Sequence, residues 1–247
     1  MSFKVVIPAR YASARLPGKP LLDIAGMPMV IRVAEQAAKS GASEIVIATD
    51  FEKILQVAQD YSIKAVITRL DHASGTDRIA EVAQKLGWAD DEIVVNVQGD
   101  EPLIEPSLIN EVAQHLANSQ DAVMATACHA IHDEASLLNP NIVKVVIDAN
   151  GNALYFSRAP IPYPRDNAHK ANIQAHRHIG IYAYRVGFLK KYAQLSVTEL
   201  EKIESLEQLR VLHHGYKIGV TITQNAPASG VDTQVDLDYV RNVFKLE

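Results

Sequence analysis

The first predicted strand and the loop after it have the sequence KVVIPARYASARLPGKPL, residues 4–21. The apolar run at its start is typical of a buried strand. The loop that follows holds three cations, Arg10, Arg15 and Lys19, at the carboxyl end of that strand, where open α/β sheets bind their ligands. Because like charges repel each other, this loop predicts a bound polyanion such as a triphosphate, whose oxygens arginine forks and a lysine ammonium can hold. A solvated basic loop is the alternative.

The elements that follow predict an α/β protein. Strands are expected at 4–7, 44–48 and 65–68, with helices at 29–38 and 52–60 between them. This βαβαβ order implies a parallel sheet with right-handed crossovers. Further strands are expected at 92–97, 122–130, 143–148, 153–156, 176–184 and 218–222, and further helices at 77–86, 107–116, 200–212 and 235–244.

The domain organisation is predicted to be simple. The chain shows no internal repeat and no clear linker, so we expect one domain over residues 1–247 with a β-rich insertion at about 142–190. Asn150-Gly151 is the strongest hairpin signal in it. Residues 159–174 are rich in Pro, Asn, Arg and His and predict a loop able to close over a site.

The composition is ordinary for a soluble globular protein, with 48% hydrophobic and 21% charged residues. A net charge of −5 argues against a general nucleic-acid-binding protein, which needs a basic face. No apolar run approaches the roughly 18 residues that span a bilayer, and no signal peptide is evident. The single cysteine, Cys128, cannot form an internal disulfide. We therefore expect a cytoplasmic protein without a membrane partner.

Two acidic residues are candidate metal ligands. Asp100 follows the predicted strand at 92–97 and should emerge at the same sheet edge as the cationic loop. A carboxylate that faces a triphosphate repels it unless a divalent cation lies between them, and Mg²⁺ is usually held by one or two carboxylates plus phosphate oxygens. Asp232, just before the last predicted helix, is the candidate second ligand. Helix capping is the alternative role for both.

Two other polar segments have more than one interpretation. Ser74-Gly75-Thr76 precedes the helix predicted at 77–86 and could bind an anion, cap the helix, or do both. His176 and His178 share one face of the strand at 176–184. A metal pair is disfavoured there because no cysteines match it, so polar residues on a half-exposed strand are the plainer interpretation.

Seven segments, taken in order along nearly the whole chain, resemble those of the sugar-acid cytidylyltransferases. The first, LPGKPL at 16–21, is similar to that of the 3-deoxy-manno-octulosonate (Kdo) cytidylyltransferases, also called CMP-Kdo synthetases. The others are SGTDR (74–78), NVQGDEP (96–102), YFSR (155–158), RHIGIY (177–182), LEQLR (206–210) and GVDT (230–233). The resemblance implies a Rossmann-like fold of the nucleotide-diphospho-sugar-transferase type, with a mostly parallel central sheet and helices on both faces.

The resemblance also implies an activity: transfer of CMP from CTP to the anomeric hydroxyl of Kdo, which gives CMP-Kdo and pyrophosphate for lipopolysaccharide biosynthesis. It implies Mg²⁺ as cofactor and a homodimer. Related acceptors, 8-amino-Kdo or sialic acid, are alternatives within the enzymes. A non-catalytic nucleotide-sensing module is an alternative of another class, and it has no need for Asp100 and Asp232 together.

The expected site residues form three overlapping sets. The catalytic set is Asp100 and Asp232 as metal ligands, with Arg15 and Lys19 on the β- and γ-phosphates. The nucleotide-binding set is Arg10, Arg15, Lys19, Ser74, Gly75, Arg78 and Gln98. The substrate-binding set is Gln98, Arg158, His178, Tyr182, Glu207 and Gln208. Arg158 and His178 are the candidates for the acceptor carboxylate. Pattern alone would leave Glu207 and Gln208 on a solvated helix surface, and only the resemblance makes them ligand contacts.

Overall fold

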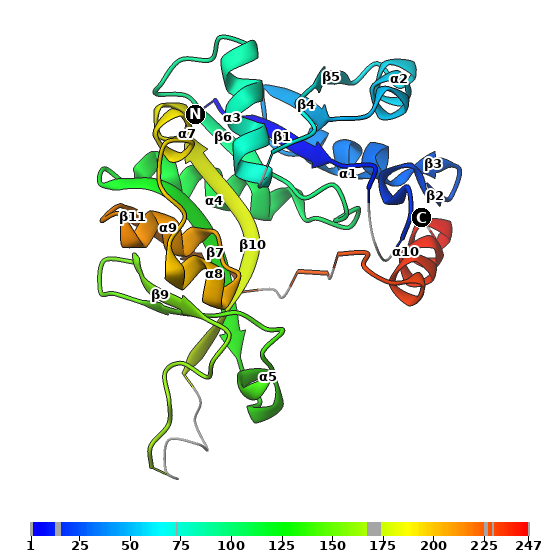
Figure 1. Cartoon of the computed structure of the whole chain (residues 1–247). Coiled ribbons are helices and arrows are strands. Elements are labelled where there is room, and N and C mark those ends of the chain that lie inside the picture. The colour runs from blue at the N-terminus through cyan, green and yellow to red at the C-terminus, as the bar shows by residue number, and fades with distance from the viewer. Residues whose placement is uncertain are drawn as a thin grey trace.

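One large sheet organises the molecule (Figure 1), as a computed structural model of the chain shows. The model describes residues 2–12, 16–72, 74–166, 174–224, 227–228 and 230–246. The strands of the sheet are β1 (Lys4–Ala9), β4 (Glu44–Thr49), β5 (Lys64–Ile67), β6 (Ile93–Asn96), β7 (Ala122–Ile131), β8 (Lys144–Ile147), β9 (Ala153–Ser157), β10 (Ala175–Arg185) and β11 (Lys217–Ile222). A separate hairpin pairs β2 (Asp23–Ile24) with β3 (Met27–Pro28).

The strand order is β11-β7-β10-β6-β1-β4-β5, and the sheet is mostly parallel, as predicted. Strands β6, β1, β4 and β5 run parallel to one another, and β7 runs parallel to β11. Strand β10 is antiparallel to both β6 and β7. It falls within the predicted insertion at 142–190 but lies in the middle of the main sheet, whereas β8 and β9 form a hairpin at its side. The turn of this hairpin contains Asn150-Gly151, as the sequence predicts.

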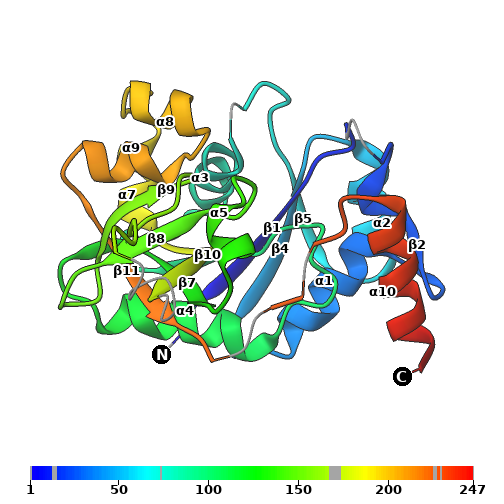
Figure 2. The same ribbon diagram turned by 90° about the horizontal axis from the view of Figure 1, so that it is seen from below.

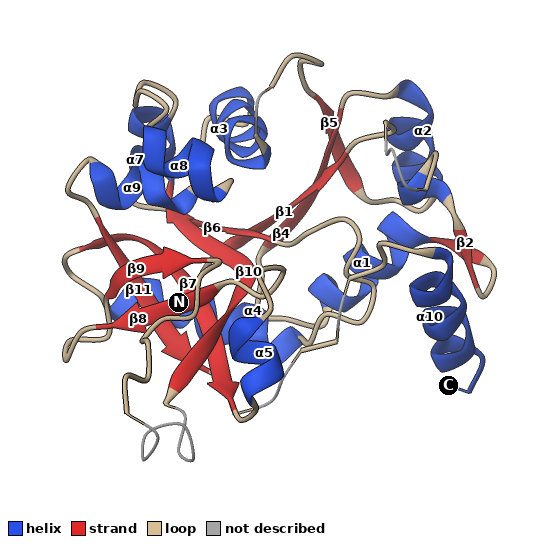
Figure 3. Cartoon of the chain, turned by 60° about the horizontal axis from the view of Figure 1, so that its bottom comes forward, coloured by secondary structure: helices blue, strands red, loops and turns tan. Residues whose placement is uncertain are grey.

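Helices cover both faces of the sheet (Figure 3). Apolar side chains of α1 (Met29–Ala38), α2 (Glu52–Asp60) and α4 (Pro106–Asn118) form the core on one face. The other face packs against α3 (Gly75–Lys85), α7 (Val186–Tyr192) and α9 (Gln208–His213). Two short helices, α5 (Glu134–Leu138) and α8 (Glu199–Glu204), complete this part of the chain. Among the described residues, no helix has both the length and the apolar character needed to cross a bilayer.

The last helix, α10 (Gln234–Leu246), lies apart from the sheet and beside β2 (Figure 2). A third apolar cluster, separate from the two main cores, joins it to the rest of the molecule. The buried members of this third cluster are Ile24, Met29, Val231, Leu237 and Val240.

The prediction of a single helix at 200–212 is wrong, because the segment forms two helices, α8 and α9. Ser205 between them adopts a left-handed conformation with φ 53° and ψ 50°, which ends α8. The leucine spacing that predicted one continuous core face therefore fails at its start, because Leu200 is 41% and Ile203 77% exposed. The break changes the direction of the chain just before Glu207 and Gln208.

Strand β10 has an irregularity where it crosses β7. Ile179 pairs with Ala127, but the next pair joins Tyr182 to Thr126, so β10 has two extra residues at this point. The Thr126 hydroxyl lies 3.0 Å from the Ile179 carbonyl oxygen and 2.7 Å from that of Ile181. Because the side-chain period of a strand is two, two extra residues leave the alternation of its faces intact.

Candidate active site

The loops after β1 and β6 meet at the carboxyl edge of the sheet, as predicted for adjacent parallel strands. They approach so closely that a Cβ atom on Gly99 would lie 2.6 Å from the Pro8 carbonyl oxygen. No side chain fits in that space, which explains why a glycine precedes Asp100. The contact places Asp100 directly beside the cationic loop.

Lys19 joins the two predicted metal carboxylates. Its ammonium donates hydrogen bonds to Asp100 Oδ2 at 2.8 Å and to Asp232 Oδ1 at 3.1 Å. Partial burial lowers the pKa of Lys19, but the hydrogen bonds and charges of Asp100 and then Asp232 outweigh this effect and raise it. The Val231 amide also donates to the Asp100 carbonyl oxygen at 2.8 Å, so the segment before α10 lies against the loop that contains Asp100. Residues about 130 positions apart in sequence are thus brought together.

A first cavity of about 340 Å³ opens over these groups. Its wall includes Arg10, Lys19, Ser74, Gly75, Gln98 and Asp100. Arg10 is exposed and donates a hydrogen bond to the His72 carbonyl oxygen at 3.1 Å, which leaves other guanidinium donors for a ligand. Ser74 caps α3 by accepting a hydrogen bond from the Asp77 amide at 3.1 Å, so one residue both caps the helix and lines the cavity.

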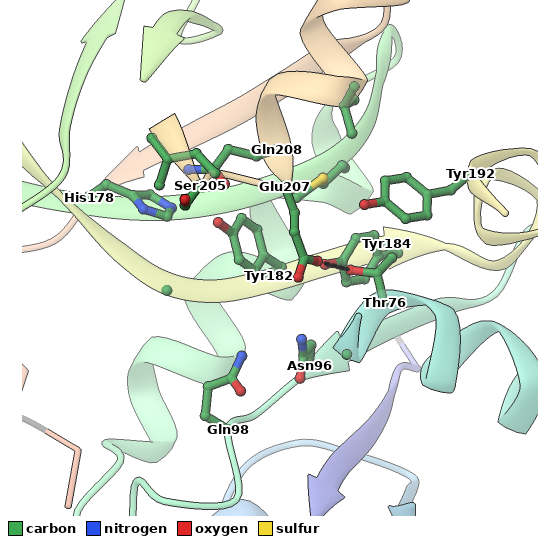
Figure 4. A pocket seen from close by; sticks show the side chains of 15 residues that line it. Thr76, Asn96, Gln98, His178, Tyr182, Tyr184, Tyr192, Ser205, Glu207 and Gln208 are labelled. Carbon is green, nitrogen blue, oxygen red and sulfur yellow. Dashed lines mark hydrogen bonds between the residues drawn. The ribbon is translucent and has the colours of Figure 1, made fainter. Parts of the chain in front are cut away.

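A second cavity of about 350 Å³ (Figure 4) adjoins the first, because both have Gly75, Gln98 and Glu207 in their walls. Four alternate residues of β10 line it: His178, Gly180, Tyr182 and Tyr184. The opposite wall is formed by Ser205, Leu206, Glu207, Gln208 and Val211 around the break between α8 and α9.

Three polar atoms in the wall of this cavity have no hydrogen-bond partner among the described residues, although they are buried. They are Asn96 Oδ1, Tyr192 OH and Gln208 Nε2. Their residues are between 1% and 4% exposed. Leaving a buried polar group unpaired costs about 1–3 kcal/mol, so this set of one acceptor, one donor and one hydroxyl marks a polar wall whose hydrogen bonds a polar ligand or ordered water completes.

His178 is neutral in this setting, because burial lowers its pKa to about 3. Its Nε2 lies 2.9 Å from Thr126 Oγ1. The Thr126 hydroxyl has a single proton, which it donates to one of the two carbonyl oxygens that it faces. His178 must therefore carry the proton of the Nε2–Oγ1 hydrogen bond and donate it to Thr126. Nδ1 is then an acceptor. This side chain can therefore accept a hydrogen bond from a ligand hydroxyl, and it does not provide the positive charge that a carboxylate would attract.

This burial predicts a pH dependence of stability. The unfolded imidazole has a pKa near 6.5 and the folded one a pKa of about 3, so the unfolded state binds an extra proton between these values. The His178 contribution is fully present above pH 6.5 and is lost as the pH falls toward 3. We expect the thermal midpoint of His178→Gln to fall less steeply with decreasing pH than that of the wild type. Parallel profiles in a melting series from pH 7 to pH 4 would contradict this assignment.

Glu207 extends into the second cavity toward Thr76 (Figure 4), and it also lines the first cavity. Part of the residue is exposed to solvent, yet its carboxyl group is closely surrounded, and Thr76 Oγ1 donates to it at 3.4 Å. Burial, followed by the charge of Asp77, raises the pKa of Glu207. A carboxyl group with a raised pKa is a functional-site signal and suits hydrogen bonding to a ligand that enters this space.

Asp100 and Asp232 are the candidate ligands for a divalent cation. Among the described residues, no group of three or more His, Cys, Asp or Glu side chains has the arrangement of a metal site. Asp100 and Asp232 alone converge, held by Lys19. Two carboxylates with open positions for phosphate oxygens match the way proteins bind Mg²⁺ together with a nucleotide, so the residues fit that cation.

Two predicted ligand contacts lie outside both cavity walls. Arg78 has no exposed surface, and its guanidinium forms an ion pair with Asp50 at 2.6 Å and a hydrogen bond to Thr68. The nucleotide contact predicted for it is therefore absent from this arrangement. Arg158 donates to the carbonyl oxygens of Glu204 at 2.7 Å and Pro140 at 3.1 Å. Arg15 lies outside the described residues, and its role stays a prediction.

Sequence reasoning missed several residues that line the second cavity, among them Asn96, Tyr184 and Tyr192. Asn96 had a usable signal, because it is a polar residue at the end of an apolar buried strand. Tyr184 follows Tyr182 at the strand period of two and so shares its face. No comparable signal marks Tyr192, which belongs to the unpredicted helix α7.

The mostly parallel sheet, the cationic loop at its edge and the paired cavities are typical of a nucleotidyltransferase. The chain belongs to the cytidylyltransferase family, whose sequence model matches residues 4–218. The chain is similar to a solved CMP:2-keto-3-deoxy-manno-octonic acid synthetase complexed with CTP, at 45% identity over 99% of this chain and 98% of that one, with a TM-score of 0.92. A cytidylyltransferase from Leptospira borgpetersenii serovar Hardjo-bovis (strain JB197) shares the fold alone, at 14% identity over 100% of this chain and 87% of that one, with a TM-score of 0.66. The resemblance found in the sequence segments is thus confirmed.

Proposed function

We propose that the protein transfers CMP from CTP to the anomeric hydroxyl of Kdo and releases pyrophosphate, with Mg²⁺ as cofactor. The observation that carries the proposal is the joining of two cavities through Gly75, Gln98 and Glu207. The first cavity has cations in its wall together with Asp100, which Lys19 joins to Asp232, and the second has polar groups without partners among the described residues. The similar synthetase was solved with CTP, which supports the first cavity as the nucleotide site.

The charges of the first cavity suit a triphosphate with its cation. Asp100 and Asp232 would hold Mg²⁺, which when bound supplies positive charge that offsets the phosphate oxygens. Lys19, freed from the carboxylates, would then donate to the β- and γ-phosphates. Arg10 would contact the α-phosphate or the base. Fixed cations at these positions stabilise the charge that develops on the leaving pyrophosphate.

The second cavity suits a polyhydroxylated acceptor. Gln208 Nε2 can donate to a sugar hydroxyl, while Asn96 Oδ1 and neutral His178 can accept from one. An acceptor bound there would present a hydroxyl at the shared wall beside Gln98. That oxygen loses its proton to solvent water and forms the new bond to the α-phosphorus, as the bond from this phosphorus to the oxygen that bridges it to the β-phosphorus breaks and pyrophosphate leaves. The residues of the chain position the two substrates, and none of them is required as a covalent nucleophile.

The test is pyrophosphate release from CTP, Mg²⁺ and Kdo, with omission of each component and with sialic acid or 8-amino-Kdo in place of Kdo. We expect release only with all three components and not with sialic acid. Release with a different acceptor only would overturn the choice of sugar acid. Binding of CTP without release for any acceptor would favour the nucleotide-sensing module. The homodimer, the cytoplasmic location, the single-domain organisation and the role in lipopolysaccharide biosynthesis remain predictions.

A further inference from the structure

The third cluster contacts each of the three segments that carry the charged groups of the first cavity. Lys19 lies between Leu16 and Leu22, which both pack against the cluster. Asp100 begins the loop that contributes Leu103. Asp232 directly follows Val231, which is fully buried in the cluster. The cluster therefore connects the segments of Lys19, Asp100 and Asp232 through apolar side chains.

Short backbone links transmit the position of the cluster to the charged groups. The Lys19 amide donates to the Leu16 carbonyl oxygen at 3.1 Å, and the Leu22 amide donates to that of Lys19 at 3.1 Å. The Val231 amide donates to the Asp100 carbonyl oxygen at 2.8 Å. A displacement of the cluster residues would therefore displace the ammonium and both carboxylates relative to one another.

Helix α10 determines where Asp232 lies. The helix contributes Leu237 and Val240 to the cluster, each 1% exposed. Its other anchors are on the same side of the molecule: Arg241 donates to the Asp23 carbonyl oxygen at 2.9 Å, and the Arg32 guanidinium lies 4.7 Å from the Phe244 ring centroid. Figure 2 shows this helix beside β2 and away from the strands of the main sheet. The packing of α10, rather than the main cores, thus holds the second carboxylate in place.

We propose that the third cluster is a positioning device for the cation–nucleotide site, in which Leu237 and Val240 hold Lys19, Asp100 and Asp232 at their mutual distances. Neither residue lines the first or the second cavity, so both are positioning residues. Interiors are close-packed, and loss of even one or two methyl groups moves their neighbours. The inference rests on the proposed function only in taking the bound cation and nucleotide to be Mg²⁺ and CTP.

The test compares Val240→Ala with Val112→Ala. Both change a buried helical valine, but Val112 belongs to the core on the α4 face. Binding of Mn²⁺, a probe for the divalent cation, is measured by calorimetry in the presence of CTP and without an acceptor. We expect about 10-fold weaker Mn²⁺ binding for Val240→Ala, as for the loss of a residue that orients metal ligands, and wild-type binding for Val112→Ala. The KM for Kdo should stay unchanged in both variants, because the second cavity does not contact the cluster.

Wild-type Mn²⁺ affinity in Val240→Ala, or equal losses in the two variants, would overturn the inference. If Val240→Ala does not fold, Phe244→Leu at the partly exposed edge of the cluster decides the question: weaker Mn²⁺ binding supports the proposal, and unchanged binding contradicts it. Absence of pyrophosphate release by the wild type would count against the proposed function alone, because the Mn²⁺ measurement needs no turnover.

Discussion

Asp100→Asn is expected to lower the turnover number for pyrophosphate release by more than about 100-fold while the protein stays folded. The substitution keeps the size of the side chain and removes the charge that pairs with Lys19 at 2.8 Å. It also removes one of the two carboxylates that fit Mg²⁺. The Asp100 side chain is 35% exposed, so the loss should be catalytic rather than structural. Steady-state kinetics over a series of Mg²⁺ concentrations, together with a thermal melt, measure both quantities.

The matched control is Asp121→Asn. Asp121 also pairs with a lysine, Lys217, at 2.9 Å, but this pair is on the surface, with side chains 74% and 53% exposed. Exposed pairs contribute little, so the control should have wild-type turnover and stability. Near-normal turnover of Asp100→Asn would remove this residue from the metal role and would leave the sensing module as the better account of the site.

Arg78→Met is expected to destabilise the folded protein by about 3–5 kcal/mol. The Arg78 side chain is fully buried and Asp50 is 8% exposed, so the substitution leaves a nearly buried carboxylate without its cation. It also removes the hydrogen bond to Thr68. Chemical denaturation of the wild type and the variant, with pyrophosphate release as a parallel assay, measures the effect.

A double-mutant cycle provides the control for this prediction. If the cost comes from the unpaired charge, Asp50→Asn in the Arg78→Met background should recover part of the lost stability. The ion pair joins α3 to the end of β4, so the same cycle reports how firmly this helix is held. A loss of CTP binding without any loss of stability in Arg78→Met would restore the nucleotide contact that the sequence predicts.

The edge of the sheet was predictable because it depends on local patterns. Short apolar runs followed by polar loops identified β1 and β6, and parallel pairing then required that Lys19 and Asp100 lie close together. The seven sequence segments, taken in order, were enough to identify the family. The shared edge of the sheet and the family resemblance together account for the residues predicted in the wall of the first cavity.

The remaining features depend on contacts between residues far apart in sequence. The leucine spacing at 200–212 continues through Ser205, and nothing in the pattern indicates a left-handed residue that is not glycine. Arg78 lies in a motif beside the cavity, and only its distant partner Asp50 shows that it is directed into the core. The unpaired hydroxyl of Tyr192 becomes meaningful only when α7 packs over the sheet. Tertiary packing decides these cases, which local patterns do not encode.

The two extra residues of β10 restrict how the length of this chain can change. His178 precedes the two extra residues and Tyr182 follows them, yet both side chains reach the same cavity because the excess is an even number. Deletion of one of these residues, where pairing with β7 does not absorb it as a one-residue bulge, would reverse every later side chain of the strand and exchange Tyr182 and Tyr184 for Ala183 and Arg185. A change of two residues at this point leaves the lining of the second cavity unchanged without any such bulge. A one-residue deletion that reversed the strand would place Arg185 on the cavity face and two tyrosines in the core on the opposite face.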